Sequence, residues 1–274
     1  MGAIMHLLHH RAATASAVIL VAIALLAIIG PHFSRYSLDQ IDWNYLPGAP
    51  ALANGHWFGT DASGRDLFVR TMIGLRVSLL VGLAAASVSF VIGVTWGATA
   101  GYLGGHIDSF MMRFVDVLYS LPYLFFVIVL TVVFGSNIYL MFIALGAVGW
   151  LTMARIVRGQ TLALRHREFI AAAVLAGVPT SRIIRRHIVP NVMGPVVAYA
   201  ALAVPQVILY ESFLSFLGLG VQEPLTSLGR LVAEGSAEME SSPWMLLIPA
   251  AFLSALLLCL NFIADAMREW TGKQ

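Results

Sequence analysis

The chain has 274 residues, of which 59% are hydrophobic and only 11% are charged, and its mean hydropathy is +0.84. Soluble domains carry about 25% charged residues, so this composition excludes a soluble globular protein and indicates an integral membrane protein. The only cysteine is Cys259, which excludes an intrachain disulfide. The only lysine is Lys273, which excludes a GxxxxGK[ST] phosphate loop. If ATP drives this protein, a different chain must bind it.

The first membrane span is predicted at residues 12–31, a charge-free run of twenty residues. At 1.5 Å per residue, such a helix crosses a hydrocarbon core of about 30 Å. The preceding flank, residues 1–11, contains His6, His9 and His10, which could bind a metal but are more simply explained as residues that face the lipid headgroups. No convincing small-residue cleavage site follows, so we expect an uncleaved span rather than a signal peptide.

Residues 32–76 are expected to be an ordered polar loop outside the membrane. Within it, the string HWFGTDASGRD alternates glycine turns with side chains that can cap a helix or form ion pairs. This string can be a structural turn that ties the loop to the next span, which we favour, or a surface that contacts another protein or a substrate. The candidate residues are Gly59, Thr60, Asp61, Gly64, Arg65 and Asp66.

The uncharged residues 77–105 predict a second span, and a short polar connection follows it. Asp116 ends this connection, and Arg113, at helical spacing, is its expected ion-pair partner. The next uncharged run, residues 117–154, is too long for one span. We therefore expect it to form the third and fourth spans, joined by a turn at residues 135–137.

The fifth span is predicted at residues 188–210, and the sixth at residues 241–264, after an acidic loop at 211–240. Pro122 is expected to kink the third span, which membrane helices tolerate when neighbouring groups satisfy the freed backbone. Because the helices are apolar on nearly all sides, their pattern does not indicate which residues line a path. In this division the core comprises residues 77–270, and the tail comprises residues 271–274.

The segment 155–190 is the most basic part of the chain. It holds seven of the sixteen basic residues but only one acidic residue, Glu168, so it cannot lie in hydrocarbon and is expected to be a loop on the membrane surface. A helix is predicted at residues 162–175; Gly177 should end it, and Pro179 should begin a second one. The segment is therefore predicted to be a stiff, protruding helix pair that fits a socket on a partner.

Within this segment, the run EFIAAAVLAGVPTSRIIRRHIVPN resembles the EAA loop of permease subunits of binding-protein-dependent ABC importers. This chain has Val178-Pro179 after the glycine, where the family usually has Ala-Ser. The strings at residues 56–82 and 211–224, and the terminal NFIADAMREW, are similar to further signatures of peptide permeases in that family. The matching EAA-loop positions are Glu168, Ala171, Ala172, Gly177, His187 and Pro190.

The resemblance implies an all-α integral membrane protein with six transmembrane helices and the type I ABC importer permease fold. It also implies three kinds of partner: a second permease subunit, two ATP-binding subunits that carry ATP and Mg, and a periplasmic or lipid-anchored peptide-binding protein. Membrane lipid surrounds the chain, which would itself bind no cofactor, metal or nucleic acid and catalyse no reaction. The residues expected to couple it to the ATP-binding subunits are Glu168, Ala171, Ala172, Gly177, Arg182, His187 and Pro190.

Oligopeptides are the substrate class that the resemblance favours, and dipeptides, nickel and antimicrobial peptides remain alternatives. A secondary transporter or channel is a more distant alternative, because the interiors of the apolar runs are essentially uncharged. An intramembrane enzyme is less consistent with the sequence, since HExxH and GxSxG motifs are absent.

With six spans, both termini lie on the same side of the membrane as the segment 155–190. That side carries eleven of the sixteen basic residues. The positive-inside rule therefore predicts that both termini and this segment lie in the cytoplasm. The resemblance implies that the membrane is the bacterial inner membrane, which the chain would cross several times. The loops at 32–76 and 211–240 would then face the periplasm.

Overall fold

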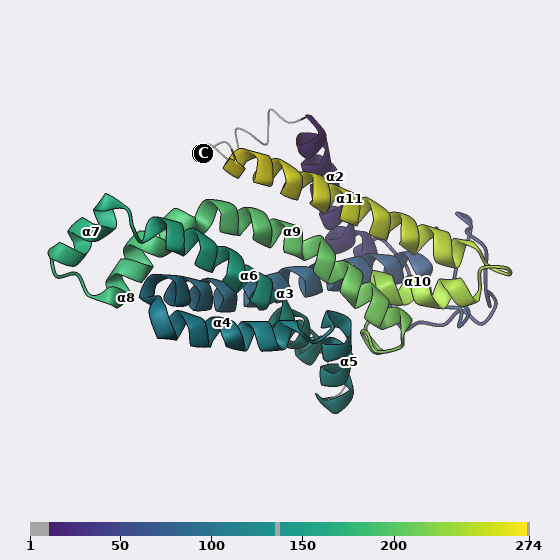
Figure 1. Cartoon of the computed structure of the whole chain (residues 1–274). Helices are drawn as coiled ribbons and strands as arrows, with labels where there is room; N and C mark the ends of the chain where they lie inside the picture. Colours follow the sequence, from purple (N-terminus) through teal and green to yellow (C-terminus); the bar gives the residue numbers. More distant parts are fainter. Residues whose placement is uncertain (1–10, 135–137, 273–274) are drawn as a thin grey trace.

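The computed structural model of the chain describes residues 11–134 and 138–272 (Figure 1). In these ranges the backbone forms helices and loops, with isolated β-bridges in place of strands. Residues 1–10 of the predicted flank 1–11, the turn at 135–137 and the last two residues lie outside the described residues. The elements are α2 (Arg11–Ile29), η1 (Gly30–His32), α3 (Leu67–Leu103), α4 (Gly105–Tyr119), α5 (Tyr123–Phe134), α6 (Ile138–Leu164), α7 (Glu168–Leu175), α8 (Thr180–Ile183), the π-helix η2 (Ile184–Ile188), α9 (Val189–Phe216), α10 (Leu228–Ala237) and α11 (Trp244–Gly272).

The bundle is elongated, and its long helices run roughly along its length (Figure 1). At one end α7 and α8 protrude beyond the other helices, and we call this the α7 end. At the opposite end lie α10 and the loops that connect it, and we call this the α10 end. The two ends are built from different parts of the chain, so each can carry a separate function.

Four stretches of the described chain are long and apolar enough to cross a membrane: Arg11–His32, Leu67–Leu103, Thr180–Phe216 and Trp244–Thr271. The pair α4 and α5 adds a fifth if it is one span broken by an 81° bend. The helix α6 is not among them, and it carries Arg155 and Arg158 in its second half. An all-helical membrane fold is therefore confirmed, whereas the count of six spans is not.

The start of α3 and the position of Pro122 both differ from the prediction. The helix α3 begins at Leu67 instead of residue 77, because the Asp66 side chain caps it by accepting a hydrogen bond from Val69 N at 2.9 Å. Pro122 does not kink a continuous span. It lies in the break between α4 and α5, where a proline without an N–H ends helical hydrogen bonding.

Three further predictions for the connecting segments differ from the structure. The expected polar connection after the second span is the helix α4, and α10 lies in what was expected to be an acidic loop, with the Ser227 hydroxyl accepting from Arg230 N at 3.1 Å. The helix predicted from residue 162 is instead the end of α6, and α7 begins separately at Glu168. Local polarity misled the prediction, because both new helices bury one face against the bundle.

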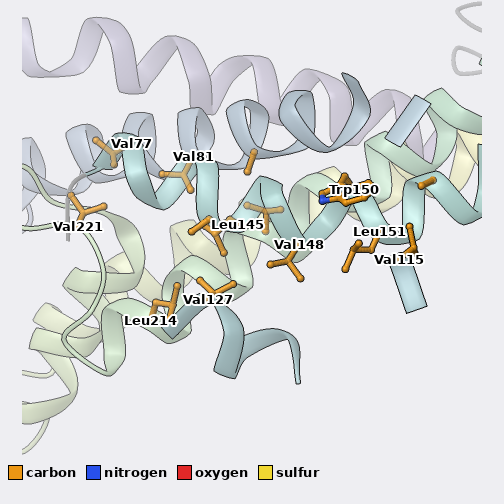
Figure 2. Packing of buried hydrophobic residues seen from close by; sticks show 14 of the residues in the cluster. Val77, Val81, Val115, Val127, Leu145, Val148, Trp150, Leu151, Leu214 and Val221 are labelled. Atoms are coloured by element: carbon orange, nitrogen blue, oxygen red, sulfur yellow. The ribbon is translucent and has the colours of Figure 1, made fainter. Parts of the chain in front are cut away.

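The largest hydrophobic core lies between α3, α4, α5, α6 and α9 (Figure 2). In Figure 2, Val77 and Val81 of α3 lie toward the same end as Val221, while Trp150, Leu151 and Val115 fill the other end. This cluster joins α6 to both α4 and α5, although the chain bends by 81° between α4 and α5.

Glycines allow α3 and α6 to approach closely. A Cβ atom at Gly97 would lie 2.4 Å from the Ala154 carbonyl oxygen, and one at Gly101 would lie 2.8 Å from Cβ of Thr161. Small residues at every fourth position let two membrane helices make backbone contact, and Gly93 continues this row. We therefore expect α3 and α6 to move as one body.

Ion pairs fasten α4 to α6 near the α7 end. Arg158 donates to both carboxylate oxygens of Asp108, at 2.5 and 2.6 Å. Arg155 donates to Asp116 at 2.7 Å and lies 4.0 Å from the centre of the Tyr119 ring. The prediction that Asp116 pairs with Arg113 was wrong, since its partner comes from a different helix.

Candidate functional site

The α7–α8 segment, residues 165–188, is anchored by a few buried apolar side chains. Ile170 of α7, Ile183 of α8 and Ile188 of the π-helix are at most 2% exposed and belong to one cluster with Val157 of α6 and Ala98 of α3. The segment is therefore packed against the two helices that are joined by the glycine row. A force on α7 can be transmitted directly to α6 and α3.

Several other apolar side chains of α7 are open to the surface. Leu175 is 89% exposed, Val174 is 53% exposed and Phe169 is 43% exposed. The predicted residues Ala171 and Ala172 are exposed between them. Exposed apolar side chains clustered on a protruding helix are characteristic of a protein contact.

The break after α7 has the geometry that the sequence predicted. Gly177 adopts φ +72°, its N–H donates to Val174 O at 3.0 Å, and Val178 N donates to Ala173 O at 3.1 Å. This is a Schellman motif. It requires a residue in the left-handed conformation, which glycine adopts most readily. Pro179 then caps α8 in an extended conformation.

The other predicted coupling residues lie on the same segment in different surroundings. Glu168 is exposed in the first turn of α7, and among the described residues it pairs with neither Arg165 nor Arg167. Arg182 is exposed and His187 is half-buried, with its carbonyl oxygen accepting from the Asn191 side chain at 2.7 Å. Pro190 lies in the first turn of α9, directly after the π-helix, within the continuous helical stretch Thr180–Phe216.

At the α10 end, the glycines of the GTDASGRD string make close backbone contacts. Gly59 has φ +80°, and a Cβ there would lie 2.5 Å from Gly48 O. Gly64 has φ +79°, and a Cβ there would lie 2.7 Å from Asp42 O. The hydroxyl of Thr60 donates to Tyr45 O at 2.7 Å and accepts from Gly48 N at 2.6 Å. These contacts hold the loop of residues 42–66 against the start of α3.

His56 is buried between two acidic residues of the same loop. Its Nδ1 lies 2.8 Å from Asp66 and its Nε2 lies 3.4 Å from Asp42, while Tyr36 stacks on the ring at 4.0 Å between centroids. Burial raises the pKa of Asp66, whereas a backbone hydrogen bond from Asn44 lowers the pKa of Asp42. The cap of α3 is therefore part of a wider buried polar cluster.

A chain of ion pairs joins this loop to α10. Asp61 is buried, pairs with Arg65 at 2.8 Å and also contacts Arg70. Arg70 also forms an ion pair with Glu234 at 2.9 Å, and Arg65 forms one with Glu223 at 2.9 Å. The hydrogen bond from Arg65 lowers the pKa of Glu223, with the positive charge adding to the effect.

These contacts give each of the six candidate residues of the GTDASGRD string an intrachain partner, and they favour the structural interpretation of that string. The partners Glu223 and Glu234 lie more than 150 positions away in sequence. The sequence placed them in a separate acidic loop, residues 211–240. The arginines of residues 32–76 and the glutamates of residues 211–240 were the signal from which pairing between these two segments could have been predicted.

A buried polar junction near the end of α9 was also missed. Glu211 is 0% exposed, and it accepts a hydrogen bond from Ser215 at 2.7 Å and a longer one from Ser78 of α3 at 3.5 Å. Ser78 in turn accepts from Leu228 N at 3.1 Å, and Ser215 lies 3.3 Å from Ser227. The ESFLSFLGLG string therefore joins α9 to α3 and to the start of α10.

Comparisons with known proteins identify the family. The family described as "Binding-protein-dependent transport system inner membrane component" matches residues 93–273. A second, "N-terminal TM domain of oligopeptide transport permease C", matches residues 2–50. Among solved structures, the MetNI methionine ABC transporter in an inward-facing conformation is similar with a TM-score of 0.59 and 17% identity, over 75% of this chain and 96% of that chain. At this identity the similarity shows the type I importer permease fold alone.

Three relatives illustrate the sequence similarity. The chain is 57% identical to the oligopeptide transport system permease protein OppC of Escherichia coli K12, over 96% of this chain and 87% of that protein. It is 54% identical to OppC of Haemophilus influenzae, over 95% and 84%. It is 43% identical to the dipeptide transport system permease protein DppC of Bacillus subtilis, over 95% and 81%. The chain thus belongs to the inner membrane components of binding-protein-dependent transport systems, the permease subunits of ABC importers.

Proposed function

We propose that this chain is the permease subunit of an oligopeptide importer in the bacterial inner membrane and forms half of its translocation path. The observation that carries this proposal is the 54–57% identity to oligopeptide permeases over more than four fifths of both chains. Dipeptides are the second candidate, because the dipeptide permease of Bacillus subtilis is 43% identical. A second permease subunit and a periplasmic or lipid-anchored peptide-binding protein would complete the path.

Within this proposal, the α7–α8 segment contacts ATP-binding subunits, which hold ATP and Mg, and the α7 end faces the cytoplasm. The support is structural: an apolar, exposed face on α7 lies directly above buried anchors to α6 and α3. Closure of the ATP-binding subunits would displace α7, and the packed helices would carry that displacement into the path. Such a mechanism needs two conformations of similar free energy and a ligand that biases them.

The substrate is tested by uptake in a strain that lacks the native importer. The chain is expressed with its partner subunits, and uptake of labelled dipeptides is compared with uptake of tetrapeptides and pentapeptides. Oligopeptide uptake that depends on this chain is the expected result. Uptake restricted to dipeptides would support the second candidate instead, and uptake of neither would contradict both.

The coupling contact is tested by two surface substitutions with matched exposure. Leu175 at the tip of α7 is 89% exposed, and Leu52 at the α10 end is 83% exposed. Leu175→Asp should reduce co-purification of the ATP-binding subunits about ten-fold or more, because a charge would replace an apolar contact. Leu52→Asp is the control and should leave co-purification unchanged. Equal retention in both variants would contradict the contact.

Gly177 and Glu168 provide an independent test of the same contact. Gly177→Val should distort the Schellman motif, and Glu168→Lys should reverse the charge at the start of α7. Each is expected to lower uptake and weaken association with the ATP-binding subunits while the chain still inserts in the membrane. Normal transport by both variants would exclude a coupling role for these residues.

A further inference from the structure

A cleft of about 530 Å³ lies on the side of the bundle where α3, α6 and α9 face the break between α4 and α5. It is lined by neither the exposed face of α7 nor the ion pairs at the α10 end. No charged side chain is among the described residues that line it. Arg155 lies over the ring of Tyr119 at the rim of the cleft, and its charge is balanced by Asp116, which accepts a hydrogen bond from it at 2.7 Å.

The α9 wall of this cleft is a stripe of polar side chains. Tyr199, Gln206 and Tyr210 line the cleft together with Ala203, and their spacings of four, three and four residues place them on one face of the helix. The helix is otherwise largely apolar in this region. Polar groups at membrane depth are unfavourable unless they find partners, and they commonly line a cavity or a path.

Gln206 is the group in this stripe whose hydrogen-bonding capacity is open. It is exposed, and among the described residues its amide forms no hydrogen bond. A side-chain amide offers two donors and an acceptor, which is the same set that a peptide main chain requires in return. The amide therefore points to a ligand with both donors and acceptors.

The remaining walls are fixed by contacts within the protein. The ring of Tyr123 lies 4.3 Å from that of Tyr210, and its hydroxyl donates to Leu145 O at 3.2 Å. Ser89 donates to Gly146 O at 3.0 Å. A Cβ atom at Gly149 would lie 2.5 Å from the Ser89 hydroxyl oxygen, so the backbone of α6 lies close to this side chain. The two tyrosine rings thus form a fixed aromatic surface in the same cleft as the open amide.

The length of the stripe suits a short extended peptide. Tyr199 and Tyr210 are eleven positions apart, which corresponds to about 16 Å along a helix. An extended chain spans about 3.3–3.6 Å per residue, so about five peptide residues would lie along the stripe. The main chain is the part that peptides of every sequence share, and a neutral lining repels neither acidic nor basic side chains.

We propose that this cleft is a peptide-binding subsite on this subunit's side of the path. The Gln206 amide binds the main chain of the passing peptide, and the rings of Tyr123 and Tyr210 pack against its side chains. The cleft thereby accepts peptides without selecting their charge. This inference rests on the proposed function, since it assigns a role to the cleft only if peptides cross through this subunit.

A reciprocal charge substitution tests the subsite. Uptake by the complete importer is measured for pentapeptides that differ only in a central Lys, Gln or Glu, with the same binding protein throughout. Gln206→Glu should shift the ratio of Lys-peptide to Glu-peptide uptake upward about five-fold or more, and Gln206→Lys should shift it in the opposite direction. Two variants with the wild-type ratio, in an importer that still takes up peptides, would overturn the subsite but not the proposed function. No peptide uptake by the wild-type complex would overturn both.

Thiol labelling gives a second readout that does not require activity of the variant. Cys259 is the only cysteine of the chain, so Cys259→Ser provides a clean background for Gln206→Cys and for Leu209→Cys, which is 50% exposed on α9 but outside the cleft. In the purified complex, saturating pentapeptide should slow labelling at position 206 about three-fold or more and leave position 209 unchanged. Labelling at 206 that peptide does not alter, or alters equally at 209, would overturn the subsite.

Discussion

Arg158 of α6 donates two hydrogen bonds to Asp108 of α4, at 2.5 and 2.6 Å, although fifty positions separate the two residues in sequence. The Asp108 and Arg158 side chains are 10% and 34% exposed, whereas those of Asp116 and Arg155, the second pair between these helices, are 61% and 38% exposed. The two pairs therefore differ chiefly in the burial of the acid and in the number of hydrogen bonds, since Arg155 makes one and Arg158 makes two. This difference gives a comparison within one helix interface.

Arg158→Ala should lower the free energy of unfolding by about 1–3 kcal/mol, because it leaves the Asp108 carboxylate without its partner in a mostly buried place. Arg155→Ala should lower it by less than about 1 kcal/mol, as expected for an exposed pair. Thermal unfolding of the detergent-solubilised complex measures both. The same loss of stability in the two variants would show that neither burial of the acid nor the second hydrogen bond sets the strength of these pairs.

Gly97→Ala should destabilise the α3–α6 contact by about 1–3 kcal/mol, since the new Cβ would lie 2.4 Å from Ala154 O. Gly159→Ala in α6 is the matched control, because nothing lies within 4 Å of a Cβ there. It should be neutral or stabilising by up to about 1 kcal/mol, through its better helix propensity. A neutral Gly97→Ala variant would contradict the close approach of the two helices.

Glu211→Leu should cost about 1–3 kcal/mol of stability, because it removes the acceptor of the buried Ser215 hydroxyl. Glu211→Gln keeps an acceptor oxygen of similar shape and should cost less. The order of the two melting temperatures, with Gln above Leu, is the measurement. A reversed order would show that the junction gains nothing from its hydrogen bonds.

Acid should loosen the α10 end through Glu223. Its pKa is lowered from the usual 4.5 by the hydrogen bond from Arg65, so its contribution to stability is fully present above pH 4.5 and is lost as pH falls through the lowered value. Asp66 acts in the opposite sense: burial raises its pKa, and stability is lost as pH rises through the raised value. Glu223→Gln should therefore reduce the acid sensitivity of the loop, measured by protease cleavage between pH 6 and 3. An unchanged pH profile would exclude this carboxylate as the cause.

Some features of this protein were determined by the sequence because they depend on neighbouring residues. The helix stop at Gly177 needs only a glycine before an extended proline, and the apolar runs need only their own length and hydropathy. The EAA-loop string likewise lies within one continuous segment. Local chemistry was enough to predict a membrane protein with a protruding helix pair, and the resemblance of that string indicated a permease.

Other features were decided only by the tertiary structure, because their cause lies far away in the chain. Arg70 lies in a helix that was predicted to begin later, and its charge is tolerated because Glu234 is folded against it. Tyr199, Gln206 and Tyr210 become one wall of a cleft only when α3, α6 and the α4–α5 break close around them. Hydropathy reports how favourably a residue leaves water, whereas partners and cavities arise from packing between segments that the sequence does not place together.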